Sequence, residues 1–172
     1  RRREGAPSAG LQGPTAEEFK KGVKRTLLSI MAKRLKKEAE ALASEDLDWG
    51  MAEPTDDLFV WEASISGPEG SPYEGGLFNL SLKFPDNYPF KPPDVVFTTK
   101  MFHPSIKKET GEICADILKS DWKPTLNIKW ILTILREMLK EPSVDSPLEP
   151  TIAQLLQENP DEFASQAAKH TK

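Results

Sequence analysis

Hydrophobic residues near the amino terminus recur at intervals of three and four, the period of an amphipathic helix. Thr15 and Glu18 form a capping-box pattern just before the first of them. The apolar positions are Phe19, Val23, Leu27, Ile30 or Met31, Leu35, Ala39 and Leu42. We therefore predict one long helix beginning at Thr15, or two helices stacked end to end.

After residue 49 the period of the apolar positions changes to two, as in half-buried strands. The residues that share a face are Phe59, Trp61, Ala63 and Ile65 in one segment, and Phe78, Leu80, Leu82 and Phe84 in the next. Turns rich in glycine and proline at 67–72 and 75–76 separate the two segments. With residues 95–99 and a weaker strand at 49–53, the pattern predicts an antiparallel meander of about four strands.

The last third of the chain returns to a helical pattern. One apolar stripe, which Pro142 ends, consists of Trp130, Ile131, Ile134, Leu135, Met138 and Leu139. A short helix is expected at 152–156, and Asn159 followed by Pro160 predicts a final helix that runs to about Ala168. Amphipathic helices cover sheet faces, so the predicted fold class is α+β: a four-stranded antiparallel sheet covered by an N-terminal helix and C-terminal helices.

Composition narrows the function classes. The chain has 172 residues, of which 38% are hydrophobic and 29% charged, as is typical of a soluble single domain. Its net charge of -4 argues against a nucleic-acid partner, because such binding needs clustered cations. No apolar run approaches the ~20 residues of a membrane span, so membrane insertion is not expected. Residues 1–14 have little to bury and are predicted to be a flexible tail.

The chain has one cysteine and two histidines. These counts exclude an intrachain disulfide, a multi-thiolate metal site and a zinc-binding histidine pair, so no metal site and a reducing compartment, cytoplasmic or nuclear, are expected. Cys114 is either a buried inert side chain, as most free cysteines are, or a nucleophile. Its setting among loop signals, with no second thiol to oxidise onto, favours the nucleophile.

Several segments around Cys114 carry a family pattern. They are residues 88–93, 98–106, 111–118, 121–124 and 145–148, with the sequences YPFKPP, TTKMFHPSI, GEICADIL, DWKP and DSPL. In their order and spacing they resemble the ubiquitin-conjugating enzyme family, over nearly all of residues 31–170. The resemblance implies a catalytic domain at 31–172 and makes residues 15–30 an N-terminal helical extension.

The resemblance also implies a mechanism. Cys114 would accept the carboxyl terminus of ubiquitin, or of a similar modifier, from an activating enzyme as a thioester, and pass it to a substrate lysine or a ligase cysteine. Glu112 and Asp116 flank Cys114 and would disfavour a second negative charge, while neither histidine is adjacent to act as a base. These surroundings suit a carrier thiol better than a hydrolase. No cofactor is expected, since the upstream activating enzyme consumes the ATP.

The chain departs from the family at Ser105, where the usual His-Pro-Asn reads His103-Pro104-Ser105. The family asparagine supports either the loop or the oxyanion, and losing one oxyanion donor costs on the order of 10²- to 10³-fold in rate. Four alternatives stay open: Ser105 donates directly, another group compensates, lysine transfer is slow without a ligase, or Ser105 merely pins a turn.

Other site residues follow from the resemblance. His103 and Pro104 are expected to form a structural turn, and Asp116, Asp145 and Ser146 are candidates for the rim of the site. Phosphate on Ser146 would add about -1.5 to -2 charges beside the entering lysine.

For partner binding, Phe90 and Pro124 align with the apolar pad that ligases grip, and Arg34 and Lys37 with the basic contacts of activating enzyme and ligase. Alternatively, 88–93 is a plain loop or a proline-rich ligand segment, and the basic residues of the first helix are only solvated surface.

Two rival classes are kept. A catalytically weak variant of the family would act mainly as a binding scaffold, although Cys114 speaks against it. A cysteine hydrolase or a redox enzyme would need a paired base or a second thiol near Cys114. Residues 107–114 and 144–148 are similar to the peroxisome-associated branch of the family, so peroxisome association is a further expectation.

Overall fold

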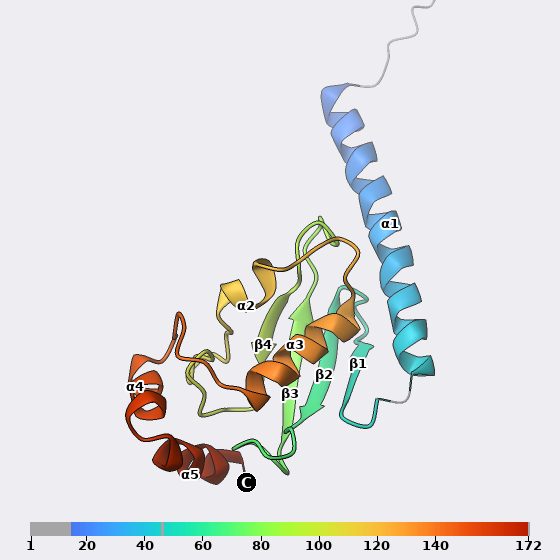
Figure 1. Ribbon diagram of the computed structural model, residues 1–172. Helices are drawn as coiled ribbons and strands as arrows, with labels where there is room; N and C mark the ends of the chain where they lie inside the picture. Colours follow the sequence, from blue (N-terminus) through green and yellow to red (C-terminus); the bar gives the residue numbers. More distant parts are fainter. Residues whose placement is uncertain (1–14, 46, 172) are drawn as a thin grey trace, which may run out of the picture.

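A single 29-residue helix, α1 (Ala16–Ser44), opens the part of the chain that the computed structural model describes, residues 15–45 and 47–171 (Figure 1). Its first turn is held by the predicted capping box: the Thr15 N–H donates to Glu18 Oε2 at 2.8 Å, and the Glu18 N–H donates to Thr15 Oγ1 at 3.2 Å. Of the two alternatives, one continuous helix is therefore the correct one. No helix in the described ranges is apolar over a length that could cross a lipid bilayer.

The apolar stripe of α1 is buried in one half of the helix and exposed in the other. Met31 and Leu35 are buried where the helix passes the sheet, with Ala39 and Leu42 partly buried behind them. The earlier members of the stripe, Phe19, Val23, Leu27 and Ile30, are exposed on the half of α1 that extends past the sheet (Figure 1). The sequence pattern alone does not separate these halves, because both have the same period.

The predicted meander is confirmed. Strands β1 (Gly50–Pro54), β2 (Val60–Ser66), β3 (Leu77–Lys83) and β4 (Asp94–Phe97) form one sheet in the order β1-β2-β3-β4, and every neighbouring pair is antiparallel. The register places Ala63 opposite Leu80, and Leu82 opposite Val95. The inward residues of adjacent strands therefore meet on one buried face.

Helix α3 (Ile128–Lys140) packs on this buried face (Figure 1). It begins at Asn127, whose side chain accepts the Trp130 N–H at 2.9 Å, and it ends before Pro142, as the pattern predicts. Its buried residues are Ile128, Ile131, Leu132, Leu135 and Leu139. They share the core with Trp61, Ile65 and Leu82 of the sheet.

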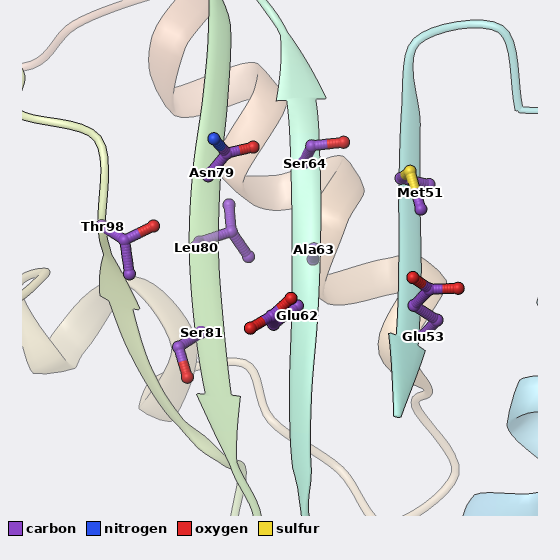
Figure 2. Close-up of a pocket in the computed structure, with 9 residues that line it drawn as sticks. All are labelled: Met51, Glu53, Glu62, Ala63, Ser64, Asn79, Leu80, Ser81 and Thr98. Carbon is purple, nitrogen blue, oxygen red and sulfur yellow. The ribbon is translucent and has the colours of Figure 1, made fainter. Parts of the chain in front are cut away.

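The opposite face of the sheet is polar and open. A hollow of about 470 Å³ lies on this face. Figure 2 shows the residues that line it, among them Glu53 of β1, which lies directly across from Glu62 of β2. Ser64, Asn79 and Ser81 continue this surface across β2 and β3. Like charges in directly opposed positions are unfavourable, so this pair does not stabilise the sheet.

Three further helices complete the fold: α2 (Ala115–Lys119), α4 (Pro150–Glu158) and α5 (Pro160–Thr171). The short α2 begins immediately after Cys114, and the sequence pattern did not predict it. Helix α5 starts where expected, with the Asn159 side chain accepting the Glu162 N–H at 3.2 Å. It runs three residues beyond the predicted Ala168, to Thr171, and His170 in this last turn stacks on Phe102.

Candidate active site

Cys114 lies at the amino-terminal end of α2, in the wall of a groove of about 480 Å³. Its side chain is partly exposed. Its N–H donates to the Ser105 carbonyl at 3.0 Å, and its carbonyl accepts the Ile117 N–H at 3.2 Å. The groove is lined by Pro92, Pro93, Asp94, Val95, Val96, Lys107, Glu112, Ile113, Cys114, Leu118, Lys119 and Leu148. The thiol is thus fixed by its backbone and open to a polypeptide lying in the groove.

A tight turn positions Cys114. Ile106 and Ile113 form an isolated bridge, and the Lys107 N–H donates to the Glu112 carbonyl at 2.9 Å. The turn closes at Gly111, whose φ of 73° lies in the left-handed region. A Cβ at this position would lie 1.9 Å from the Phe97 carbonyl oxygen, so only glycine fits.

Charges of both signs surround the thiol. Glu112 and Asp116 are exposed beside it, as the sequence suggested. The structure adds Lys107 and Lys119, which line the same groove and which sequence reasoning missed. Lys107 is brought there by the turn, where its Nζ lies 3.7 Å from Glu112 Oε2. The acids next to Cys114 are therefore partly balanced by cations that are more distant in sequence.

The segment from residue 143 to residue 149 is tied to the same site. The Pro104 carbonyl accepts the N–H groups of Leu148 and Glu149, at 2.9 and 3.0 Å. Leu148 consequently lines the groove with Cys114, and the exposed Asp145 and Ser146 belong to the same segment. Of the three expected rim residues, Asp145 and Ser146 lie on the segment that Pro104 ties to the groove, and Asp116 follows Cys114 in α2; none of the three lines the groove itself.

Within this segment Asp145 is held by a local contact. Its Oδ2 accepts the Ser143 hydroxyl at 2.9 Å, and its N–H donates to Ser143 Oγ at 3.0 Å. Ser146 has a φ of 47°, a left-handed conformation that is uncommon for a residue with a side chain. Both side chains stay exposed to solvent.

His103 is a buried structural residue. It is 0% exposed, its Nδ1 accepts the Ser105 N–H at 3.0 Å, and its Nε2 lies 3.1 Å from the Met138 carbonyl. With Nε2 protonated and Nδ1 free, the neutral ring satisfies both contacts. Burial lowers the pKa of His103 from 6.5 to about 4, although the Met138 carbonyl opposes this shift. Both ring nitrogens are engaged, so the ring is not placed to take a proton from Cys114.

Ser105 lies between His103 and Cys114 and is 4% exposed. Two main-chain hydrogen bonds connect it to these residues: the Ser105 N–H donates to His103 Nδ1, and the Ser105 carbonyl accepts the Cys114 N–H. This main-chain arrangement suits the turn-pinning alternative. The position of Ser105 next to the nucleophile suits the oxyanion alternative, so both stay predictions.

Among the described residues that line the groove of Cys114, none is a histidine. Between residues 15 and 171, Asp46 excepted, no three His, Cys, Asp or Glu side chains are grouped to hold a metal ion. The second histidine, His170, stacks on Phe102 at a ring distance of 5.2 Å and approaches the Gln166 carbonyl.

The residues expected to bind partner proteins come together at a second place, beside α1. Arg34 donates from Nη1 to the Pro124 carbonyl at 2.8 Å and from Nη2 to the Leu126 carbonyl at 2.6 Å. Phe90 is 71% exposed, and the loop that carries it is tied to the Pro124 loop by Trp122, whose Nε1 donates to the Pro89 carbonyl at 2.7 Å.

Glu38 stabilises this second surface through hydrogen bonds, a role that the sequence analysis did not predict. Its carboxylate accepts hydrogen bonds from Arg34 Nε at 2.8 Å, the Tyr88 hydroxyl at 2.7 Å and the Ile128 N–H at 2.9 Å. Burial, and then the Glu38 carboxylate, raise the pKa of Tyr88 well above its usual value. Arg34 therefore has a structural role in addition to any contact with a partner, whereas Lys37 is exposed on α1.

Known proteins are similar to this chain in sequence. The family model described as ubiquitin-conjugating enzyme matches residues 34–171. A probable ubiquitin-conjugating enzyme E2 31 of Arabidopsis thaliana is 41% identical over 140 residues, which are 81% of this chain and 90% of that protein. A ubiquitin conjugating enzyme E2 B of Dictyostelium discoideum is 43% identical over 141 residues, 81% of this chain and 95% of that protein.

Solved structures of ubiquitin-conjugating enzymes are similar to this chain in fold. A crystal structure of a putative ubiquitin conjugating enzyme from Plasmodium yoelii has a TM-score of 0.76 and 39% identity, covering 80% of this chain and 90% of that one. The E2 domain of a Toxoplasma gondii ubiquitin conjugating enzyme has a TM-score of 0.75 and 37% identity, covering 81% and 94% of the two chains.

Proposed function

The chain belongs to the ubiquitin-conjugating enzyme family, and from this premise we propose that Cys114 is the thiol on which it carries ubiquitin. Members of the family are acyl transferases that work through a cysteine thioester. Their general partners are ubiquitin, an activating enzyme and ligases. The assignment of individual residues to these steps is our proposal.

One observation carries it: the chain's single cysteine is partly exposed in a groove next to a rigid turn, without a neighbouring histidine in the described lining. A thiol in such a place can exchange with another thioester. It has no paired base with which to activate water, as a hydrolase would need.

In the first transfer, the Cys114 thiolate attacks the carbonyl carbon of the thioester between ubiquitin and the activating enzyme. A new S–C bond forms, the old S–C bond breaks, and the activating enzyme's thiolate leaves. Exchange between thiols of similar pKa is nearly balanced in free energy, so Cys114 needs access more than strong activation. The cations Lys107 and Lys119, which line the groove, can partly offset the negative charge of Glu112 and Asp116 near the thiolate during this step.

In the second transfer, a lysine amine attacks the thioester carbonyl carbon, a C–N bond forms, the S–C bond breaks, and Cys114 leaves as the thiolate. The lysine must first lose a proton, and the carboxylate of Asp145, on the segment that Pro104 ties to the groove, is our candidate for accepting it. Ser146 and Asp116 complete the rim. Ser105 is the candidate for supporting the oxyanion, directly or through the main chain.

We assign the surface of Arg34, Lys37, Phe90 and Pro124 to the activating enzyme and to ligases. The support is that Arg34 and Pro124 are in contact, and that Phe90 exposes a large apolar side chain on the adjoining loop. Aromatic residues and arginine are enriched in protein interfaces.

The test is a charging reaction. Incubated with activating enzyme, ubiquitin and ATP, the parent protein should form an adduct that disappears under reductant. Cys114→Ala should form none, and the matched Cys114→Ser should form an oxygen ester that survives reductant.

An adduct on Cys114→Ala would contradict the proposal. Failure of the parent to charge would instead favour the scaffold alternative. Ubiquitin as the modifier, and a cytoplasmic, nuclear or peroxisome-associated location, are further proposals that a panel of activating enzymes and cell imaging would test.

A further inference from the structure

Strand β1 lies at one edge of the sheet, with β2 as its neighbour. At one end of the ladder between them, the Trp49 carbonyl accepts the Ser66 N–H at 2.8 Å. At the other end, the Thr55 N–H donates to the Val60 carbonyl at 2.9 Å. Bonded positions alternate along an antiparallel pair, and both ends place them at the odd-numbered residues of β1.

The even-numbered residues of β1, which are Gly50, Ala52 and Pro54, therefore direct their backbone groups away from β2. Pro54 agrees with this register, because proline is tolerated in a strand where its nitrogen faces outward. Among residues 15–45 and 47–171, no hydrogen bond joins the Ala52 N–H or carbonyl to a group outside the sheet. The edge at Ala52 is thus open to pairing with another strand.

A groove of about 360 Å³ runs along this edge, where the carboxyl-terminal turns of α1 lie alongside β1 (Figure 1). The helical wall of the groove consists of Ala39, Leu42 and Ala43. Ala39 and Ala43 are one turn apart, and their small side chains leave room between the helix and the strand. The charged residues among the described lining, Glu45 and Glu53, are both acidic. The groove therefore combines an apolar wall with an acidic border.

The open face of the sheet adds a second observation at the same edge. Glu53 and Glu62 are exposed and directly opposed, and Figure 2 shows both on this face. Within the described ranges, neither carboxylate is ion-paired with a Lys or Arg. Opposed like charges are unfavourable, so a cation brought by another molecule would relieve the repulsion. A strand added outside β1 would place every second side chain on this face, next to Glu53.

We propose that β1 is a docking edge, extended by a segment of a partner protein in which basic and apolar residues alternate. In such strand addition, main-chain hydrogen bonds supply affinity and alternate side chains supply specificity. The residue that pairs with Ala52 shares its face, so its apolar side chain enters the groove beside Leu42. The adjacent basic residues lie beside Glu53 on the open face.

Charge distinguishes this occupant from a second copy of the chain. A second copy paired along β1 would bring its own Glu53 and Glu62 to the same face and increase the repulsion. The groove of Cys114 lies at the other edge of the sheet, where Val96 of β4 bridges Glu112. Three strand spacings, about 14 Å, separate the two edges. A segment bound at β1 therefore leaves Cys114 accessible, and the proposal does not depend on the thioester chemistry.

The first test uses a short synthetic peptide of alternating lysine and valine as the probe. Titrated into the isotope-labelled full chain, it should shift the NMR signals of β1 and slow the hydrogen exchange of the Ala52 N–H by at least about tenfold at saturation. One control peptide has glutamate in place of lysine, and the other has the same composition with the lysines grouped. Both should bind at least about tenfold more weakly, because charge or alternation is lost.

The second test changes the edge. Ala52→Pro removes the outward N–H without breaking a bond to β2 and should weaken peptide binding by about tenfold. The matched Ala52→Gly keeps the N–H and should stay within about twofold of the parent. Glu53→Gln combined with Glu62→Gln should weaken binding severalfold at low salt, and the difference should shrink as salt is added. This double variant should melt no earlier than the parent, since a repulsion is removed. If Ala52→Pro does not fold, the double variant and the exchange of the Ala52 N–H in the parent decide.

Equal affinity for the lysine and glutamate peptides, or an unchanged exchange rate of the Ala52 N–H at saturation, would overturn the proposal. Shifts confined to Ser64, Asn79 and Ser81 would do the same, because the open face would then bind without the edge. A dimer that light scattering detects and that Ala52→Pro dissociates would assign the edge to a second copy, which also overturns it. The proposed function is tested separately, by the adduct on Cys114.

Discussion

The neutral, buried His103 makes the stability of this protein depend on pH between about 7 and 4. Burial lowers its pKa from 6.5 to about 4, and its two ring nitrogens are already used by Ser105 and Met138. The unfolded chain therefore binds a proton more readily than the folded one. The stability that the neutral ring provides is complete above pH 6.5 and is lost as the pH falls towards 4.

The size of the effect follows from the shift in pKa. A difference of one pKa unit corresponds to about 1.4 kcal/mol, so the full loss is about 3 kcal/mol. By pH 5 about 2 kcal/mol should already be lost. This is a large part of the 5–15 kcal/mol that is typical for the stability of a folded domain.

Urea unfolding at pH 7, 6 and 5 would measure this. The parent should lose about 2 kcal/mol across this range, whereas His103→Gln should be less stable at pH 7 but lose much less on acidification. If the variant does not fold, an NMR titration of His103 in the parent can replace it. A titration midpoint of His103 near 6.5, or an equal pH dependence in parent and variant, would refute the reasoning.

Three further predictions concern other positions. Ser105→Asn should leave charging unchanged but speed discharge onto free lysine by about tenfold or more, and equal discharge rates in a single-turnover assay would reject a catalytic role. Glu38→Ala should lower the free energy of unfolding, measured with urea, by about 2–4 kcal/mol, because the Arg34 guanidinium, the Tyr88 hydroxyl and the Ile128 N–H lose their acceptor. The matched change at an exposed position, Glu40→Ala, should lower it by less than about 0.5 kcal/mol. Comparable losses in the two variants would contradict the stabilising role of Glu38. Gly111→Ala should lower the free energy of unfolding by at least about 2 kcal/mol more than Gly70→Ala. Both positions have a left-handed backbone, but only at Gly111 would the added Cβ clash with another residue, at the Phe97 carbonyl oxygen. Similar melting temperatures for the two would count against that close approach.

The sequence predicted those parts of the fold that local periodicity determines. The capping box at Thr15, the alternating strands and the helix that ends before Pro142 all depend on residues close together in the chain, and all are found. Cys114 was also identifiable, because it is the single cysteine and lies in a recognisable series of segments.

The features that the sequence did not reveal depend on contacts between distant segments. Lys107 reaches the groove of Cys114 only through the bridge between Ile106 and Ile113. Glu38 is one of many charged residues on α1, and its role becomes visible only when Tyr88 and the start of α3 converge on it. The exposed half of α1 was not predictable either, because helical spacing gives a face but not the element that covers it.

The unbroken course of α1 has a mechanical consequence. A helix of 29 residues is a rod of about 43 Å, and its carboxyl-terminal half is fixed to the domain at Met31 and Leu35. A group bound near Phe19 is therefore held at a set distance and orientation from the sheet, because a continuous helix is a rigid connection and not a flexible linker. A fluorophore placed there would tumble at the rate of the whole molecule.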